Sequence, residues 1–403
     1  MDQQKSIVFL GFSNFPYGLA EAQKIILISK SLLLKQNKVS VISRNGTYAK
    51  DENPGLKPEG FYENIHYKYV SGSCHRNDSF VKRRLLELNG KINEFRLLRK
   101  MKKEHNLDFA IMSTRNFSLI LYYFFLSKFL GFKIILNYVE YYTAIKKRKY
   151  QFTKRLNDFL FDNYAPPLSD AVFPISEFLI WHFKKNSPEK PFLKIPVLTD
   201  FSRYENIESI ESEKYFLFCG YAGYKEIIFF IIDSFELITD PFFFLYLVIN
   251  GSKNDMEVIE NYIESKRKKD KIKKFNRLSQ KSLFTYYKNA TALLIPLRPT
   301  LQDIARFPHK IGEYLASGNP VISTNYVEVK KYFIDMNNML LAESYDEKLF
   351  AEKIQFVIDH PKESKKIGLA GKELATKFFD YRYMADELNE FLNKCLNGRK
   401  KML

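Results

Sequence analysis

The chain has 403 residues, of which 46% are hydrophobic and 16% aromatic, so it holds enough apolar material for two domains and is not a disordered polypeptide. A formal net charge of +17 predicts an anionic partner, which in principle is a phosphorylated substrate, an anionic membrane surface or nucleic acid. The cysteines Cys74, Cys219 and Cys395 have no metal or redox spacing, and their odd number argues against a disulfide framework. We therefore expect a reducing, cytoplasmic environment.

Neither a signal peptide nor a membrane span is expected. The first residues run straight into a strand, and the most apolar stretch, residues 117–136, is interrupted by Lys128, Gly131 and Lys133. The net charge gathers in four basic runs, which are either solvated helix faces or contacts with an anion: residues 82–84, 96–103, 146–149 and 266–274. Nucleic acid is the least favoured partner, because no zinc spacing or recognition-helix pattern accompanies these runs.

The first half of the chain alternates β-rich and amphipathic segments. The pattern predicts strands over Ser6–Leu10, Lys38–Ser43, Asp108–Ser113, Phe132–Tyr138, Ala171–Ile175 and Lys194–Val197. It predicts helices over Leu19–Leu34, Ile92–Lys103, Phe117–Phe129 and Glu177–Lys185. Strands separated by helices imply a parallel sheet covered on both faces, so we expect a Rossmann-like domain over residues 1–198.

A polar stretch, residues 199–214, is predicted to be a linker, after which the alternation restarts in a second domain over residues 215–380. The predicted strands are Tyr215–Gly220, Phe242–Asn250, Lys271–Leu278, Thr291–Leu297, Pro320–Thr324 and Asn338–Ala342. The predicted helices are Glu226–Ile238, Asp255–Lys268, Lys281–Asn289, His309–Ser317, Asp346–Ile358 and Pro361–Phe379, the last with a kink near Gly368 or Gly371. A terminal helix lies within residues 381–403 and packs either in the second domain or back on the first.

Functional residues are sought after the strands, because ligands of open parallel sheets bind beyond the carboxyl ends. In the first domain, Gly18 precedes a helix and either lets the backbone approach a phosphate or acceptor, or is a simple turn glycine. Arg115 and Glu140 follow neighbouring strands and are predicted to face a common cleft. There Glu140 is a candidate acid or base, with a solvated surface role as the alternative.

In the second domain, the turn after the first strand carries Gly220 and Lys225, an arrangement that fits a diphosphate cradle. After a later strand, a short helix presents Lys310 and Glu313 at its start and ends at Gly318. These positions predict that a cation, a carboxylate and free backbone N–H groups meet at one crevice, as binding of a phosphorylated sugar nucleotide requires.

The loop before this helix adds three candidates. Arg306 is placed to pair with a phosphate and Asp303 with a sugar hydroxyl, or the two side chains simply bind one another. His309 is expected to donate a hydrogen bond at the helix start and not to bind a metal, since no second His or Cys lies at a ligand spacing. No metal site is predicted.

Several enzyme classes lack their motifs in this sequence. It has no dinucleotide fingerprint G-x-G-x-x-G, no P-loop, no G-x-S-x-G nucleophile elbow and no H-E-x-x-H zinc helix. A phosphate-binding enzyme without a P-loop remains.

The chain resembles the glycosyltransferases of family 4, which have the GT-B architecture, an α/β fold of two facing Rossmann-like domains. The likeness is most specific over residues 215–379: residues 218–225 look like the family's first strand and lysine loop, and residues 307–324 look like its donor-site helix. By this resemblance Glu313 holds the ribose of a nucleotide diphosphate sugar and Lys225 neutralises the diphosphate. Lys310 and Arg306 add positive charge near the leaving group.

Two positions depart from the family pattern. Many members carry a second glutamate where this chain has Ala305, which makes Asp303 the nearest substitute for a carboxylate that contacts the sugar. Many also have an arginine where Tyr221 stands.

The resemblance implies a retaining, metal-independent transferase without a cofactor, which moves a sugar from a nucleotide diphosphate sugar to a glycan or lipid-linked acceptor in surface polysaccharide biosynthesis. The basic faces of the first domain would then hold the enzyme on the inner face of the cell membrane. Two alternatives stay open at this point: a GT-B sugar-nucleotide epimerase, and a non-catalytic partner that binds nucleotide sugars.

Overall fold

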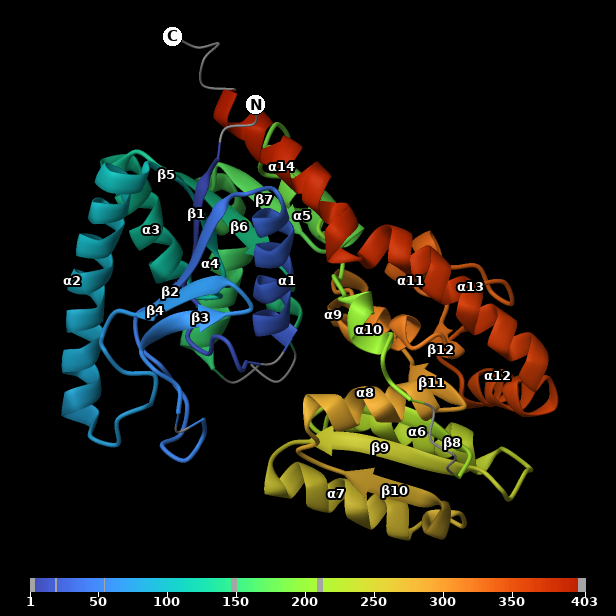
Figure 1. The fold of residues 1–403 in the computed structure, drawn as a ribbon. Coiled ribbons are helices and arrows are strands. Elements are labelled where there is room, and N and C mark those ends of the chain that lie inside the picture. The colour runs from blue at the N-terminus through green and yellow to red at the C-terminus, as the bar shows by residue number, and fades with distance from the viewer. Residues whose placement is uncertain (1–3, 19, 54, 146–150, 209–212, 398–403) are drawn as a thin grey trace. The chain divides into compact units, whose positions relative to one another are not determined.

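The computed structural model describes residues 4–18, 20–53, 55–145, 151–208 and 213–397. The basic run at residues 146–149 therefore lies outside the described residues. The chain divides into two compact units (Figure 1). Unit 1 comprises Met1–Leu198 together with the segment from Tyr381, and unit 2 comprises Thr199–Asp380.

Unit 1 is built on a seven-stranded sheet in the order β3-β4-β2-β1-β5-β6-β7. Its strands pair in parallel except for the antiparallel pair β3–β4. The strands are β1 (Ser6–Leu10), β2 (Lys38–Ser43), β3 (Glu59–Tyr62), β4 (Ile65–Tyr69), β5 (Leu107–Met112), β6 (Lys133–Tyr138) and β7 (Ala171–Pro174). The central strand β1 is buried along its whole length, as a strand covered on both faces must be.

The helices of unit 1 follow its strands along the chain: α1 (Ala20–Leu34), α2 (Phe80–His105), α3 (Phe117–Leu130), α4 (Phe152–Leu168) and α5 (Glu177–Lys184). The last helix, α14 (Tyr381–Asn397), comes from the C-terminal end of the chain and packs against α1 (Figure 1). Its side chains Met384, Leu388 and Leu392 belong to the same buried core as Phe9 of β1. The C-terminal segment is therefore an integral part of unit 1.

Unit 2 has a six-stranded, fully parallel sheet in the order β10-β9-β8-β11-β12-β13. The strands are β8 (Tyr215–Tyr221), β9 (Phe244–Asn250), β10 (Ile272–Phe275), β11 (Ala292–Ile295), β12 (Val321–Thr324) and β13 (Leu340–Ala342). The helices are α6 (Lys225–Glu236), α7 (Lys253–Glu264), α8 (Gln280–Asn289), α9 (Leu301–Ala305), α10 (Lys310–Ala316), α11 (Val327–Tyr332), α12 (Glu347–Asp359) and α13 (Pro361–Phe379). Two parallel-sheet, Rossmann-like domains with a C-terminal helical segment were predicted, and this prediction is confirmed.

Several details differ from the sequence-based expectation. The β3–β4 hairpin and the helices α4, α9 and α11 were not predicted, and the predicted strand at Lys194–Val197 is irregular backbone in the structure. Helix α2 begins twelve residues earlier than expected, because Ser79 caps it by accepting a hydrogen bond from the backbone N–H of Lys82 (3.4 Å). The predicted linker begins with a short 3-10 helix, η3 (Phe201–Tyr204), whose end residues Phe201 and Tyr204 are buried.

Helix α13 is one continuous helix over the glycines where a kink was expected. A Cβ atom on Gly368 would lie 2.5 Å from the carbonyl carbon of Asn319, and one on Gly371 would lie 2.4 Å from the carbonyl oxygen of Asn338. The glycines therefore allow α13 to lie directly against the backbone of neighbouring loops. Among the described helices, none is long and apolar enough to cross a membrane.

Helix α1 carries a buried lysine. Lys24 is 2% exposed, and its Nζ has no hydrogen-bond partner among the described residues. Burial lowers the pKa of Lys24 to about 7, although the charge of Glu21 acts in the opposite direction. Below pH 7 the folded protein must therefore hold a desolvated ammonium ion, which destabilises it.

We predict that Lys24→Met stabilises the protein at pH 7, by about 2 to 4 kcal/mol, because methionine fills a similar volume without a charge. The unfolded lysine titrates near its ordinary pKa, so wild-type stability rises with pH above about 7, and the advantage of the variant shrinks towards pH 10. Urea unfolding of both proteins at a series of pH values measures this. The exposed Lys38→Met is the control. A stability difference that does not change between pH 7 and pH 10 would contradict the prediction.

Candidate active site

The residues predicted to bind the donor follow β8 and β11, two neighbouring strands of the unit 2 sheet. Helix α6 starts at Lys225 after β8, and the loop after β11 leads through α9 to α10. Because the strands are parallel, both loops leave the same edge of the sheet.

Lys310 and Glu313 form an ion pair in the first turn of α10, with 3.2 Å between Lys310 Nζ and Glu313 Oε2. Burial disfavours the ammonium ion, but the charge of Glu313, helped by Cys219, outweighs it and raises the pKa of Lys310 above its usual range. Lys310 is thus firmly cationic at neutral pH. The pair is half-buried, so both side chains remain within reach of solvent and ligand.

Tyrosines fix α10 against the end of β8. The buried hydroxyl of Tyr314 accepts a hydrogen bond from the backbone N–H of Cys219 (2.7 Å), and the Tyr314 ring packs edge-on against Tyr287 at 5.0 Å. Lys310 Nζ lies 5.8 Å from the centre of the Tyr287 ring. The buried Tyr204 of η3 also lies near Glu313, whose charge adds to burial in raising the tyrosine's pKa. No sequence pattern pointed to a role for these aromatic residues.

Asp303 lies between two arginines in the loop after β11. Its carboxylate is completely buried and accepts hydrogen bonds from Arg298 Nε (2.8 Å) and Arg298 Nη2 (3.1 Å), while Arg306 Nη2 lies 2.7 Å away. Burial alone would raise the pKa of Asp303, but the bonds from Arg298 and the charge of Arg306 hold it below its ordinary value.

This geometry corrects the expectation for Asp303. A side chain with no exposed surface and two arginine partners is not available to a sugar hydroxyl, so Asp303 does not replace the carboxylate absent at Ala305. Ala305 is itself completely buried. Of the two alternatives in the sequence, the structure has the one in which Asp303 and Arg306 bind one another.

Both arginines also contact the ring of Tyr224, the residue before α6. Arg306 Nη1 donates to the Tyr224 hydroxyl (3.0 Å), and the Arg306 guanidinium lies 4.8 Å from the ring centre. Arg298 also reaches across to Glu226 of α6 at 2.8 Å. Arg298 and Tyr224 thus join the loop after β11 to the start of α6. The position of Arg298, directly after the predicted strand Thr291–Leu297, was the available signal for it.

Lys225 is engaged elsewhere. Its Nζ pairs with Asp255 Oδ1 of α7 at 2.8 Å, and the second oxygen of Asp255 accepts from Ser252 Oγ (2.7 Å). A diphosphate that binds Lys225 has to exchange with this carboxylate. The sequence did not predict the pair, because the two residues are thirty positions apart.

Gly220 and His309 lie at this edge of the sheet without a distinct binding feature. A Cβ on Gly220 would lie 2.6 Å from the ring of Phe218, so the glycine makes room for that ring. His309 is half-buried at the start of α10, and its side chain forms no cap hydrogen bond there. The expectation that His309 donates a hydrogen bond at the helix start stays a prediction.

In unit 1 the candidates Gly18, Arg115 and Glu140 lie after β1, β5 and β6. Gly18 is tightly packed: a Cβ there would lie 2.9 Å from both Ala22 Cβ and the carbonyl oxygen of Asn14. Arg115 is exposed. Burial raises the pKa of Tyr142 well above its usual range; the charge of Glu140 adds to this shift and the charge of Arg115 opposes it. The structure thus brings Glu140 and Arg115 to one region.

The loop that carries Glu140 is fixed by the buried Asp162 of α4. Its Oδ2 accepts from the backbone N–H (2.7 Å) and Oγ1 (2.6 Å) of Thr143, and its Oδ1 accepts from the Tyr138 hydroxyl (3.2 Å). Burial raises the pKa of Asp162 to about 6, although these hydrogen bonds act in the opposite direction. Asp162 is a positioning residue that sequence analysis missed, because α4 was not predicted.

Within the described residues, no group of three or more His, Cys, Asp or Glu side chains is arranged to hold a metal ion. Four cationic side chains lie at this edge of the unit 2 sheet, and groups of this kind bind phosphates: Arg298, Arg306, Lys225 and Lys310.

Comparison with known proteins agrees with this architecture. Residues 200–374 match the family described as glycosyl transferases group 1. The structure is similar to that of sucrose-phosphate synthase from Thermosynechococcus elongatus, with a TM-score of 0.72 and 13% identity over 98% of this chain and 100% of that chain. It is also similar to a glycosyltransferase from Rickettsia africae, with a TM-score of 0.70 and 16% identity over 98% of this chain and 99% of that one.

A third similar structure is Anabaena HepE in complex with UDP and glucose, with a TM-score of 0.69 and 13% identity over 96% of this chain and 99% of that one. The comparison with curated proteins found no match.

The two parallel-sheet units and their similarity to these structures define a GT-B protein, so the expected fold is confirmed. The family match places residues 200–374, and with them the candidate donor site, in the glycosyl transferases group 1 family, which confirms the resemblance seen in the sequence. The whole chain thus has the GT-B fold, and its second unit carries the match to the glycosyl transferases group 1.

We predict that Asp303→Asn destabilises the protein by about 3 kcal/mol at pH 7, because it leaves Arg298 and Arg306 without their buried anion. Since the pKa of Asp303 is lowered, its contribution to stability is present above pH 4 and is lost as the pH falls below that value. Urea unfolding at pH 7 and pH 3.5 measures this. Glu226→Gln removes the exposed partner of the same arginine and should cost less than about 0.5 kcal/mol. If Asp303→Asn were as stable as the wild type, the Asp303 carboxylate would not contribute to the stability of the fold.

Proposed function

We propose that this protein is a retaining glycosyltransferase that transfers a sugar from a nucleotide diphosphate sugar to a glycan or lipid-linked acceptor. The observation that carries the proposal is the Lys310–Glu313 pair at the start of α10, next to the Arg298–Arg306 cluster and inside the segment that matches the family. It combines a carboxylate, which accepts hydrogen bonds from ribose hydroxyls, with cations that bind a diphosphate.

In the proposed reaction, Glu313 binds the ribose and the cations stabilise the departing nucleotide diphosphate. Charge develops on that leaving group as the glycosidic bond breaks, so fixed positive groups beside it lower the barrier. We propose that Arg306 and Lys310, with Lys225 after its release from Asp255, supply this charge without a metal ion. Support comes from the raised pKa of Lys310, which keeps it cationic.

The donor we propose to test first is a UDP-sugar, because Anabaena HepE structures contain UDP with glucose and UDP-glucose. The acceptor would bind to unit 1, where Gly18, Arg115 and Glu140 lie at the carboxyl edge of the sheet. Hexosyl transfer in surface polysaccharide biosynthesis is the setting that the family resemblance favours.

A non-catalytic, nucleotide-sugar-binding role is the second candidate. It is favoured by one observation: Ala305 has no carboxylate, and Asp303, the nearest substitute, is buried between arginines. A GT-B epimerase would differ from both by turning over the donor without an acceptor. Release of UDP from UDP-glucose, with and without a glycan acceptor, separates the three.

Association with an anionic membrane on the cytoplasmic side completes the proposal. Helix α2 carries nine Lys or Arg residues and three Glu residues. Along one helical face it exposes Val81, Leu85, Leu88 and Ile92, each more than half exposed. An apolar stripe flanked by cations is the surface that binds at an anionic lipid interface.

We predict that Glu313→Gln weakens binding of UDP by at least about tenfold, because the amide keeps the size of the side chain but loses the charge that accepts ribose hydroxyls strongly. Calorimetric titration with UDP measures it, and thermal unfolding without ligand checks that the variant is folded. The exposed Glu352→Gln of α12 is the matched control. UDP binding by Glu313→Gln at the wild-type affinity would remove Glu313 from the site.

We predict that Leu85→Ser together with Leu88→Ser reduces sedimentation with phosphatidylcholine vesicles that contain phosphatidylglycerol, by about tenfold in partition coefficient, since two exposed apolar side chains are lost. Binding of the wild type should also weaken as salt is added. Phe242→Ser removes an exposed apolar residue of unit 2 and serves as the control. Equal pelleting of the wild type with neutral and anionic vesicles would contradict membrane association.

A further inference from the structure

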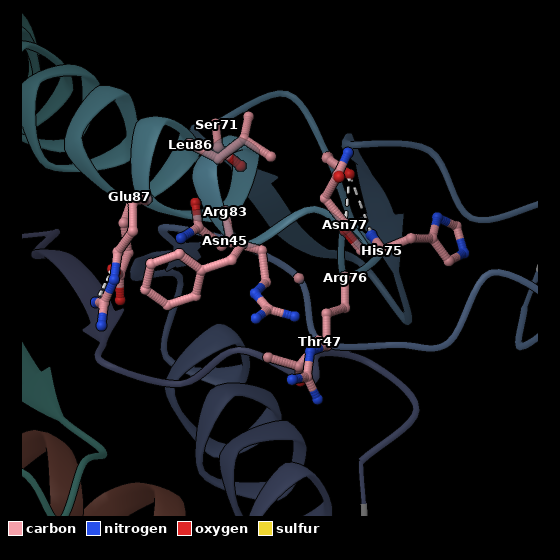
Figure 2. Close-up of a pocket in the computed structure, with 13 residues that line it drawn as sticks. Asn45, Thr47, Ser71, His75, Arg76, Asn77, Arg83, Leu86 and Glu87 are labelled. Carbon is pink, nitrogen blue, oxygen red and sulfur yellow. Dashed lines mark hydrogen bonds and ion pairs between the residues drawn. The ribbon is translucent and has the colours of Figure 1, made fainter.

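Unit 1 contains a pocket of about 320 Å³. None of the residues that line it has been given a function above. The pocket lies at the carboxyl ends of the neighbouring parallel strands β2 and β4 and at the beginning of α2 (Figure 2). This is the edge of a parallel sheet where ligands bind. Its volume is that of a small ligand group such as a phosphorylated sugar.

Backbone hydrogen bonds hold the two loops of the pocket together. The N–H of Ser71 donates to the carbonyl of Arg44 (3.0 Å), and the N–H of Gly46 donates to that of Ser73 (3.0 Å). The N–H of Arg76 donates to the carbonyl of Tyr48 (2.9 Å). The loops approach so closely that a Cβ on Gly46 would lie 1.6 Å from the carbonyl oxygen of Cys74. The floor of the pocket is therefore preformed.

Helix α2 is fixed to the same loops. With its amide nitrogen turned toward them, Asn45 donates to Ser71 Oγ and to the carbonyl of Leu86, both at 3.1 Å. Next to it, Arg44 forms an ion pair of 2.7 Å with the fully buried Glu94 of α2. The side chains that α2 presents to the pocket are thereby held in position relative to the floor.

The charges around the pocket do not cancel. Arg76, from the loop after β4, and Arg83, from α2, extend into the same hollow near Thr47 (Figure 2). In the part of the chain that the structure describes, neither guanidinium has a hydrogen bond or an ion pair with a carboxylate. The nearby acids are already paired: Glu87 with Arg84 at 2.8 Å, and Asp78 with Lys50.

The pKa of Asp78 also reflects the positive charge around the pocket. Its bond to Lys50 is the main reason that the pKa of this carboxyl lies below its ordinary value, and the charges of Arg83 and Arg76 add to the shift. The Ser71 hydroxyl and the Asn77 amide also line the pocket and supply further hydrogen-bond donors. The hydroxyls of Thr47 and Ser73, which line it too, already donate to Asn14 Oδ1 and to the carbonyl of His75. Two arginines without a carboxylate partner, with polar donors beside them, suit a phosphoryl group, whose oxygens accept hydrogen bonds from many directions.

We propose that this pocket binds a phosphoryl group, phosphate or diphosphate, of the acceptor molecule, held by Arg76 and Arg83. Its attribution to the acceptor rests on the proposed transferase function, whereas the binding of a phosphoryl group does not. Either a soluble sugar phosphate or the headgroup of a phosphorylated lipid presents this chemistry.

The test is titration of the full chain with inorganic diphosphate in the presence of saturating UDP, which keeps diphosphate out of the donor site. We expect the double variant Arg76→Gln, Arg83→Gln to bind diphosphate at least about tenfold more weakly than the wild type, because two charge-assisted contacts are lost. Arg155→Gln changes an exposed arginine of α4 that does not line the pocket, and should bind as the wild type does.

Two further arms distinguish the source of the phosphoryl group. Competition by glucose 6-phosphate would identify a soluble sugar phosphate. Cosedimentation with phosphatidylcholine vesicles that carry phosphatidic acid, lost in the double variant and kept in Arg155→Gln, would identify a lipid headgroup. The same double variant should bind UDP with unchanged affinity.

The outcomes separate this inference from the proposed function. Equal diphosphate binding by the wild type and the double variant, or no binding by the wild type, would overturn the pocket assignment even if UDP binds. Binding of diphosphate that depends on Arg76 and Arg83 in a protein that does not bind UDP would retain the pocket and reject the donor site.

Discussion

The buried carboxylate of Asp303 is the interaction on which the candidate donor site depends. A charge with no exposed surface is stable in a protein only when its partners compensate the lost hydration, and Arg298 and Arg306 do so here with contacts of 2.7 to 3.1 Å. Those same arginines reach Tyr224 and Glu226 at the start of α6. One buried anion therefore fixes the loop after β11 to the helix after β8. The same contacts hold the segment that leads from β11 to α10 in place.

The two units arrange their cations differently at equivalent edges of their sheets. In unit 2, Lys225 is paired with Asp255 and Lys310 with Glu313, so an anionic ligand gains only the difference between its own contacts and those it displaces. In unit 1, Arg76 and Arg83 face a pocket whose nearby carboxylates are bound to other cations. An anion that binds at the unit 2 site must displace an existing carboxylate partner, whereas an anion that binds in the unit 1 pocket displaces none.

Sequence patterns predicted the elements that neighbouring residues determine. Buried strands such as β1 and β8 are continuous apolar runs, and Lys310 and Glu313 share one helical turn, so both were predictable from neighbouring residues. The β3–β4 hairpin was missed because its strands are short and half exposed. Long-range pairs such as Lys225–Asp255 depend on the packing of α6 and α7, which no local pattern encodes. The burial of Asp303 was left open for the same reason.

The substitution at Ala305 also gains a physical interpretation. Ala305 is the last residue of the short helix α9, and its side chain is completely buried. The helix begins after Thr300, which accepts a hydrogen bond from the backbone N–H of Asp303. A glutamate at position 305 would place a fourth charge, and a second carboxylate, beside the buried Arg298–Asp303–Arg306 cluster. With alanine, the cluster keeps an excess of one positive charge, which Glu226 balances only from an exposed position. The loop is thus organised around cations, and any carboxylate contact with the sugar has to come from outside it.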